Sequence, residues 1–194
     1  MANDDQVKKY ANTPRSQVRR ADYAVRDEKW IKGVLAQGAY GVLATSHENQ
    51  PFATPVNYVY IEEEHALYFH GARGGRTRAN VALNPRVCFN VSEMGRLVPG
   101  ETSSDFGVEY KSVTVFGSAE LVEDAKEITQ ALLGLMAKYF PEHVPGEDYP
   151  LPMPEELKRT AVYKIKIEDW SAKRQVEEQD SPGAFHFPPM RLED

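Results

Sequence analysis

The chain has 194 residues, 41% of them hydrophobic and 27% charged, which is the composition of a globular protein large enough for one sizeable core. Its net charge of -6 disfavours a large basic face, so we expect no nucleic-acid partner. A single cysteine excludes an intrachain disulfide, and we expect Cys88 to be a small buried residue rather than a nucleophile. The chain has no apolar run long enough to span a membrane and no N-terminal signal pattern, which predicts a cytoplasmic protein without a membrane partner.

The first third of the chain predicts a polar segment, a helix and a hairpin. Residues 1–22 show little apolar periodicity, so we expect them to be mobile or wrapped over a neighbour. Asp27 is placed to cap a helix that ends at Gly38 and has one apolar face. Residues 40–46 and 52–61 predict two strands joined by a polar turn.

Residues 68–80 predict a strand end, a glycine turn and the start of a helix. Acidic side chains usually collect at a helix N-terminus, because its backbone N–H groups are unpaired, but this one carries Arg73, Arg76 and Arg78. Together with the hydroxyl of Thr77, they favour a bound phosphate. The alternative is a solvated surface loop. The glycine spacing matches neither a P-loop nor a Rossmann fingerprint.

The rest of the chain predicts more strands than helices. We expect strands over residues 86–92, 108–119 and 161–170, a helix over 124–139, and loops over 93–106 and 141–154. Gly117 indicates a bend or bulge, and the last strand alternates apolar and charged residues, as a strand with one solvated face does. About six short strands predict a mainly β protein with flanking helices, arranged as an antiparallel barrel or sandwich.

Five sequence blocks, taken in their order and spacing, resemble a known family. The blocks are residues 40–45, 51–60, 67–76, 84–89 and 110–119. They resemble the pyridoxamine 5'-phosphate oxidase-like, FMN-binding split-barrel superfamily, and within it the branch of 5-nitroimidazole resistance proteins. The resemblance implies a six-stranded antiparallel split β-barrel over residues 23–173, between the polar segment 1–22 and a loosely ordered tail, residues 174–194. It also implies a homodimer with FMN at the subunit interface.

The same resemblance assigns site residues. It places the flavin ring and ribityl chain near Thr54, Pro55, Val56 and Asn57, the phosphate near His70, Arg76 and Thr77, and an FMN contact at Ser112. The lysine that the family usually has after Arg76 is Thr77 here, which removes one positive charge from the phosphate site. The arginine-bearing C-terminal segment of true pyridoxamine phosphate oxidases has no counterpart, which disfavours the vitamin B6 reaction.

The leading functional hypothesis is an FMN-dependent oxidoreductase that passes electrons from a reduced nicotinamide or another donor to a small, for example nitroaromatic, acceptor. We assign no catalytic side chain, and we expect no metal site because the histidines lack ligand spacing. For His70 a packed core histidine is the alternative to a cofactor contact. The competing functions are a non-catalytic flavin- or haem-binding sensor and a deazaflavin-dependent reductase.

Overall fold

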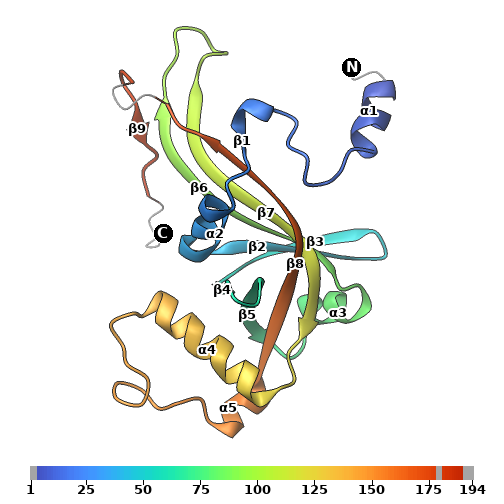
Figure 1. Ribbon diagram of the computed structural model, residues 1–194, viewed down its shortest axis with the longest axis vertical. Helices are drawn as coiled ribbons and strands as arrows, with labels where there is room; N and C mark the ends of the chain where they lie inside the picture. Colours follow the sequence, from blue (N-terminus) through green and yellow to red (C-terminus); the bar gives the residue numbers. More distant parts are fainter. Residues whose placement is uncertain (1–3, 178–180, 190–194) are drawn as a thin grey trace.

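The computed structural model describes residues 4–177 and 181–189 and shows one antiparallel sheet of nine strands flanked by helices (Figure 1). The strands are β1 (Ala24–Val25), β2 (Gly41–His47), β3 (Gln50–Val56), β4 (Tyr58–Ile61), β5 (Ala66–Ala72), β6 (Arg86–Val98), β7 (Gly107–Leu121), β8 (Thr160–Gln175) and β9 (Phe185–His186). The helices are α1 (Asp4–Ala11), α2 (Glu28–Gln37), α3 (Arg76–Leu83), α4 (Ala125–Tyr139) and α5 (Pro154–Arg159), with a 3-10 turn at Ala21–Tyr23. The mainly β class with flanking helices is confirmed.

The order of the strands closes the sheet into a split barrel. Seven strands follow the order β3-β2-β6-β7-β8-β5-β4, while β1 pairs with β8 and β9 pairs with β6. Because β3 leads directly into β4, although the two lie at opposite ends of this order, the sheet curls round on itself. The prediction of one strand over residues 52–61 is therefore wrong. Thr54 pairs with Leu43 in β2, whereas Tyr58 pairs with Phe69 in β5, so the chain leaves one ladder at Asn57 and joins another.

The barrel interior is apolar and closely packed. Leu43, Phe89, Val113 and Ile165 are fully buried, and the Tyr58 and Phe89 rings meet edge to face with their centroids 5.0 Å apart. Each large side chain buried in this way contributes about 1.5–3 kcal/mol to folding. The predicted bulge is confirmed, because the register between β7 and β8 shifts at Gly117.

A second, smaller core lies between the outer face of the sheet and α4. Tyr68, Val162 and Ile128 are buried there. The expectation that the outer face of β8 is solvated is therefore wrong over part of its length. The apolar stripe of α4 covers Val162, and the ammonium of Lys164 is held by carboxylates on Glu64 and Glu127. Charged residues on a strand can thus mark a covered ion-pair network as well as a wet face.

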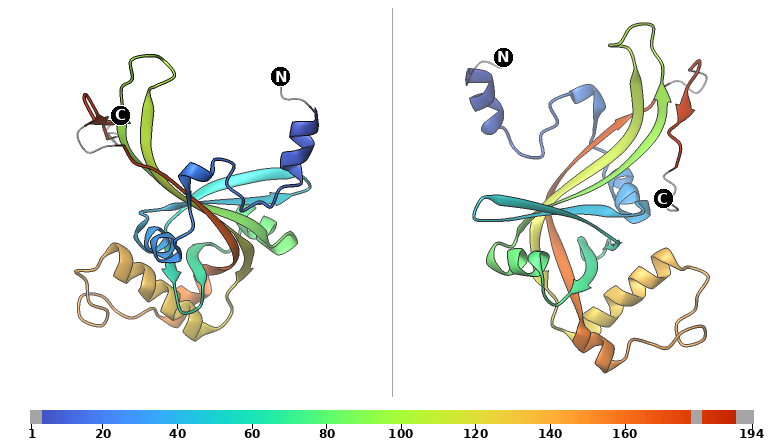
Figure 2. Two further views of the ribbon diagram at one scale, coloured as in Figure 1. Left: turned by 45° about the horizontal axis from the view of Figure 1, so that its top comes forward. Right: turned by 180° about the vertical axis from the view of Figure 1, so that it is seen from behind.

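The paired strands β6 and β7 extend beyond the barrel as a projecting arm, residues 93–98 of β6 and 107–111 of β7 (Figure 2). The loop predicted over residues 93–106 is therefore wrong for its first half. Ladder pairing resumes after an irregularity between Met94 and Leu97, and Arg96 Nη2 donates to Glu109 Oε1 across the arm at 2.7 Å. Strand pairing in the arm depends on contacts between residues that are distant in the sequence, so the local periodicity of apolar residues does not reveal it.

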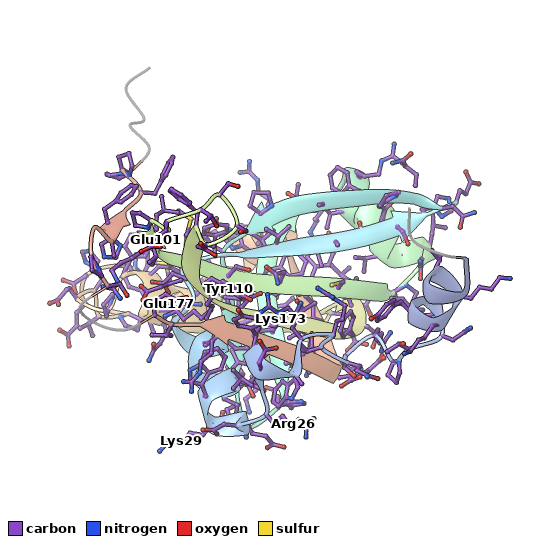
Figure 3. All side chains as sticks on the ribbon, turned by 90° about the horizontal axis from the view of Figure 1, so that it is seen from above. Arg26, Lys29, Glu101, Tyr110, Lys173 and Glu177 are labelled. Carbon is purple, nitrogen blue, oxygen red and sulfur yellow. The ribbon has the colours of Figure 1, made fainter. Side chains whose placement is uncertain are left out.

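Part of the predicted loose tail is held against the arm. β8 continues to Gln175, the backbone N–H of Glu177 donates to Glu109 Oε1 at 3.1 Å, and Figure 3 shows Glu177 and Tyr110 on this part of the molecule. β9 then pairs with β6. At the other end, residues 4–11 of the expected polar segment form α1, and Arg15 bonds to Glu168 at 3.2 Å. Residues 1–3, 178–180 and 190–194 of the two predicted end segments lie outside the described residues.

Candidate functional site

The glycine turn after β5 leads into a helix start that no side chain caps. Gly75 is the N-cap residue of α3 with a φ of 108°, in the left-handed region that favours glycine, and the first turn of the helix contains no acidic residue. A Cβ added at Gly74 or Gly75 would meet no atom within 4 Å, so the turn borders open space. The first amides of α3 are therefore available to an anion.

The three arginines of this turn have different surroundings. Arg73 Nη2 donates to the Leu157 carbonyl at 2.9 Å and so joins the turn to α5. Burial raises the pKa of the Tyr163 hydroxyl, and the nearby charges of Arg78 and Arg73 oppose that rise. Arg76 is exposed, and within residues 4–177 and 181–189 its guanidinium has no hydrogen bond or ion pair. Arg76 is therefore the arginine with most freedom to hold a phosphate.

The residues predicted to contact the flavin ring lie along an edge of the sheet. β3 pairs with β2 on one side only, so its other side carries backbone groups without a strand partner. An open hollow of about 710 Å³ lies beside this edge. It is lined by Ala39, Tyr40, Val42, Pro55, Val56 and Asn57. Three of the four predicted ring residues thus line one hollow, while Thr54 is half-buried next to it.

Side-chain hydrogen bonds join α3 to the β2–β3 hairpin, and Figure 2 shows the helix next to it. Asn80 Nδ2 donates to Thr45 Oγ1 at 2.9 Å, and Thr45 Oγ1 donates to the Phe52 carbonyl at 3.4 Å. Asn84 Nδ2 donates to the Ser46 carbonyl at 3.0 Å. The helix that carries Arg76 and Thr77 is therefore fixed to the hairpin that carries the ring hollow.

His70 and Ser112 do not line this hollow within one chain. Ser112 lies on β7, where its hydroxyl accepts from Asn90 Nδ2 at 3.1 Å and lies 3.1 Å from Ser92 Oγ. His70 is exposed on β5 and lines a different hollow beside α4. Their predicted contacts with FMN remain predictions.

The structure reveals one buried charge that sequence reasoning missed, Lys138 near the end of α4. Its ammonium lies 3.7 Å from the centroid of the Tyr58 ring, and Nζ is buried without a hydrogen-bond partner among the described residues. Burial lowers the pKa of Lys138 to about 8. Next to it, the Tyr139 hydroxyl accepts from the Tyr58 N–H at 3.0 Å and donates to the Tyr58 carbonyl at 3.2 Å. Lys138 thus contacts Tyr58, the residue directly after the strand break at Asn57, and only the packing of α4 against β4 brings the two together.

In residues 4–177 and 181–189, no three histidine, cysteine or acidic side chains come together in a way that could hold a metal ion. No helix in this described part is long and apolar enough to cross a membrane.

Solved structures share the fold. A flavocytochrome, Anf3, from Azotobacter vinelandii is 21% identical, with 94% of this chain and 89% of that chain covered and a TM-score of 0.75. An FAD- and haem-binding protein from Mycobacterium smegmatis is 18% identical, with coverages of 89% and 90% and a TM-score of 0.71. A candidate 5-nitroimidazole antibiotic resistance protein from Bacteroides thetaiotaomicron is 20% identical, with coverages of 78% and 86% and a TM-score of 0.65.

The split-barrel architecture that the sequence blocks imply is thereby confirmed. Comparison with curated proteins gives no match. The sequence profile of the family described as pyridoxamine 5'-phosphate oxidase matches residues 27–174, which is most of the chain and nearly the whole of the barrel. The chain therefore belongs to the pyridoxamine 5'-phosphate oxidase family.

Proposed function

We propose that the protein binds FMN and acts as an oxidoreductase that passes electrons from a reduced nicotinamide or another donor to a small acceptor such as a nitroaromatic. The observation that carries the proposal is the uncapped N-terminus of α3, with Arg76 unpartnered among the described residues, fixed to the hairpin whose free edge borders an open hollow. FMN carries one phosphate and one planar ring. The phosphate suits the uncapped helix N-terminus with Arg76, and the ring suits the open hollow. When bound, FMN supplies the electron transfer, and the chain supplies binding and orientation.

Each group of residues has a separate role in this proposal. The Arg76 guanidinium and the first amides of α3 hold the phosphate through charge-assisted hydrogen bonds, with the Thr77 hydroxyl beside them. The unpaired side of β3 offers backbone groups near Pro55 and Asn57 to the polar edge of the ring. The aromatic side chain of Tyr40 borders the same hollow and is 55% exposed, so it is available to cover a ring face.

A homodimer with the cofactor at the interface is part of the proposal. Tyr40 and Phe52 are exposed to 55% and 37% on the hairpin that carries the hollow, which leaves apolar surface for a second copy to cover. The hollow is open in one chain, and a partner chain would close it. Ser112, which lies outside the hollow in its own chain, would then be free to contact the partner's cofactor, whereas His70 lines the hollow beside α4.

The phosphate site is tested by measuring cofactor affinity in an Arg76→Ala variant. We expect the Kd for FMN to rise about tenfold or more, the usual effect of losing a charge-assisted hydrogen bond, while the Kd for riboflavin, which has no phosphate, stays the same. Arg86→Ala, which removes an exposed arginine beyond the other end of α3, should leave both constants unchanged. An Arg76→Ala protein that binds FMN as tightly as the wild type would overturn the site.

The position after Arg76 gives a gain-of-function test. Thr77→Lys restores the charge that the family usually has there, and we expect it to tighten FMN binding without changing riboflavin binding. FAD, which several structures of this fold are described as binding, is titrated alongside FMN to decide between the two flavins.

Turnover requires its own measurement. Flavin-loaded protein is mixed anaerobically with NADH or NADPH, and flavin bleaching is followed before and after a nitroaromatic acceptor is added. Bleaching by a donor and re-oxidation by the acceptor support the oxidoreductase. Flavin that binds but is reduced by neither donor refutes that role for reduced nicotinamides and supports the binding-protein alternative.

A second candidate function is a protein that carries both flavin and haem. Two of the similar structures, a flavocytochrome and an FAD- and haem-binding protein, favour it, and they cover 94% and 89% of this chain. The absorption spectrum of the purified protein decides, because haem gives a Soret band, and flavin and deazaflavin absorb at different wavelengths.

A further inference from the structure

A hollow of about 490 Å³ lies outside the barrel, between α4 and the chain that leads through α5 into β8. Its volume falls in the range of about 300–1,000 Å³ that is typical of small-molecule sites. It shares no lining residue with the hollow beside β3. The hollow is therefore a separate feature of the fold.

The floor of the hollow is apolar. Leu132, Leu135 and Met136 from α4 line it, and Leu135 is buried at 6% exposure. Tyr149 and Pro152, from the segment between α4 and α5, also line it. Aliphatic, thioether and aromatic surfaces around one hollow suit a flat, apolar ligand body.

The sheet supplies the polar end of the hollow. In the ladder between β5 and β8, His70 pairs with Val162 and Ala72 pairs with Thr160, so His70 and Thr160 lie side by side on the outer face. Both line the hollow, together with Arg159, the last residue of α5. The polar side chains of the hollow therefore lie together at the start of β8, next to the end of α5.

The two charged residues of the hollow lie at opposite ends of α5. Glu156 Oε2 accepts from the Met153 N–H at 2.9 Å, which holds its carboxylate toward the start of the helix, whereas Arg159 is the last residue of the helix. Within the described part of the chain, Arg159 and His70 form no hydrogen bond or ion pair through their side chains. A guanidinium and an imidazole without partners, next to an apolar floor, are complementary to a carboxylate attached to an apolar body.

We propose that this hollow binds a small organic anion with an aromatic or otherwise flat apolar body, whose carboxylate faces Arg159 and His70 while its body lies on Leu132, Leu135 and Met136. The site is separate from the proposed flavin site and does not depend on it. It adds an anion-selective binding function to the outer face of the barrel.

The probe is 2-naphthoate, and the readout is the NMR signal of methyl-labelled methionine. The chain has five methionines, of which Met136 lines the hollow and Met94 lies on the arm. The Met136 signal is assigned with a Met136→Leu variant. We expect 2-naphthoate to shift the Met136 signal saturably while the Met94 signal stays in place. The uncharged analogue 2-naphthamide should bind about tenfold more weakly, because it lacks the charge-assisted contact.

A variant pair tests the role of the guanidinium. Arg159→Gln should abolish the preference for naphthoate over naphthamide, and Arg86→Gln, an exposed arginine far along the chain, should preserve it. If Arg159→Gln does not fold, the comparison of the two probes on wild-type protein still decides. A Met136 signal that does not move, equal binding of the acid and the amide, or displacement of naphthoate by saturating FMN would each overturn the proposal.

Discussion

Lys138 allows a quantitative prediction, because its ammonium is buried without a hydrogen-bond partner in the described residues. Burial lowers its pKa from 10.5 to about 8, which corresponds to a penalty of at most about 3–4 kcal/mol on the charged form in the folded state. The side chain is only partly buried, so solvent screening reduces this to about 1–2 kcal/mol. The contact with the Tyr58 ring offsets part of the cost, about 0.5–1 kcal/mol.

We therefore expect Lys138→Met to raise the free energy of unfolding of the cofactor-free protein by about 1 kcal/mol at pH 7. The sign of the pH dependence follows from the lowered pKa. Between pH 8 and 10.5 the unfolded chain keeps a proton that the folded chain releases, so wild-type stability rises with pH in this window. The advantage of the variant should shrink accordingly as the pH approaches 10.

The assay is urea unfolding of both proteins at pH 7 and pH 9.5, with the difference between the two proteins as the observable, because every other titrating group cancels. Lys126→Met is the control, since Lys126 is an exposed residue at the other end of α4. A Lys138→Met protein less stable than the wild type at pH 7, or a difference independent of pH, would refute the view that desolvation dominates at this residue.

The remaining predictions concern the arm and the barrel. A hydrogen bond from Arg96 lowers the pKa of Glu109 from 4.5 to about 2. The pair therefore stabilises the fold above pH 4.5, and this contribution is lost as the pH falls toward 2. The melting temperature of Glu109→Gln should accordingly fall less steeply than that of the wild type from pH 5 to 2. Gly41→Ala places a Cβ 2.2 Å from the buried Phe89 ring and should lower the free energy of unfolding in urea by about 1–3 kcal/mol. Gly33→Ala in α2, whose Cβ would meet nothing within 4 Å, should raise the free energy of unfolding by about 0.5–1 kcal/mol. Equal effects of the two alanines would contradict the packing argument.

Features set by neighbouring residues could be predicted from the sequence. The side chain of Asp27 caps α2 by accepting from the Lys29 and Trp30 N–H groups, and Asp124 caps α4 in the same way through Glu127. The start of α3 after the glycine turn was also predictable, because three glycines and the following residues determine it locally.

Features that depend on distant partners could not be predicted. Lys138 is one of several charged residues on α4, and nothing in its local pattern separates it from Lys126. It is buried because the end of α4 packs against Tyr58, which lies 80 residues earlier in the chain. The placement of His70 on the outer face of the sheet likewise follows from its register opposite Val162 in β8, which no local pattern encodes.

The free edge of β3 also limits what kind of ligand the proposed flavin site can take. An unpaired edge normally invites a further strand, because it presents a row of backbone donors and acceptors. Pro51 and Pro55 interrupt that row in β3, since neither has an N–H, and the strand ends at Val56. An extended peptide would therefore find an incomplete ladder. A compact ligand that needs only a few backbone contacts and an apolar surface meets no such obstacle, which favours a small planar molecule over a peptide in the hollow beside Tyr40.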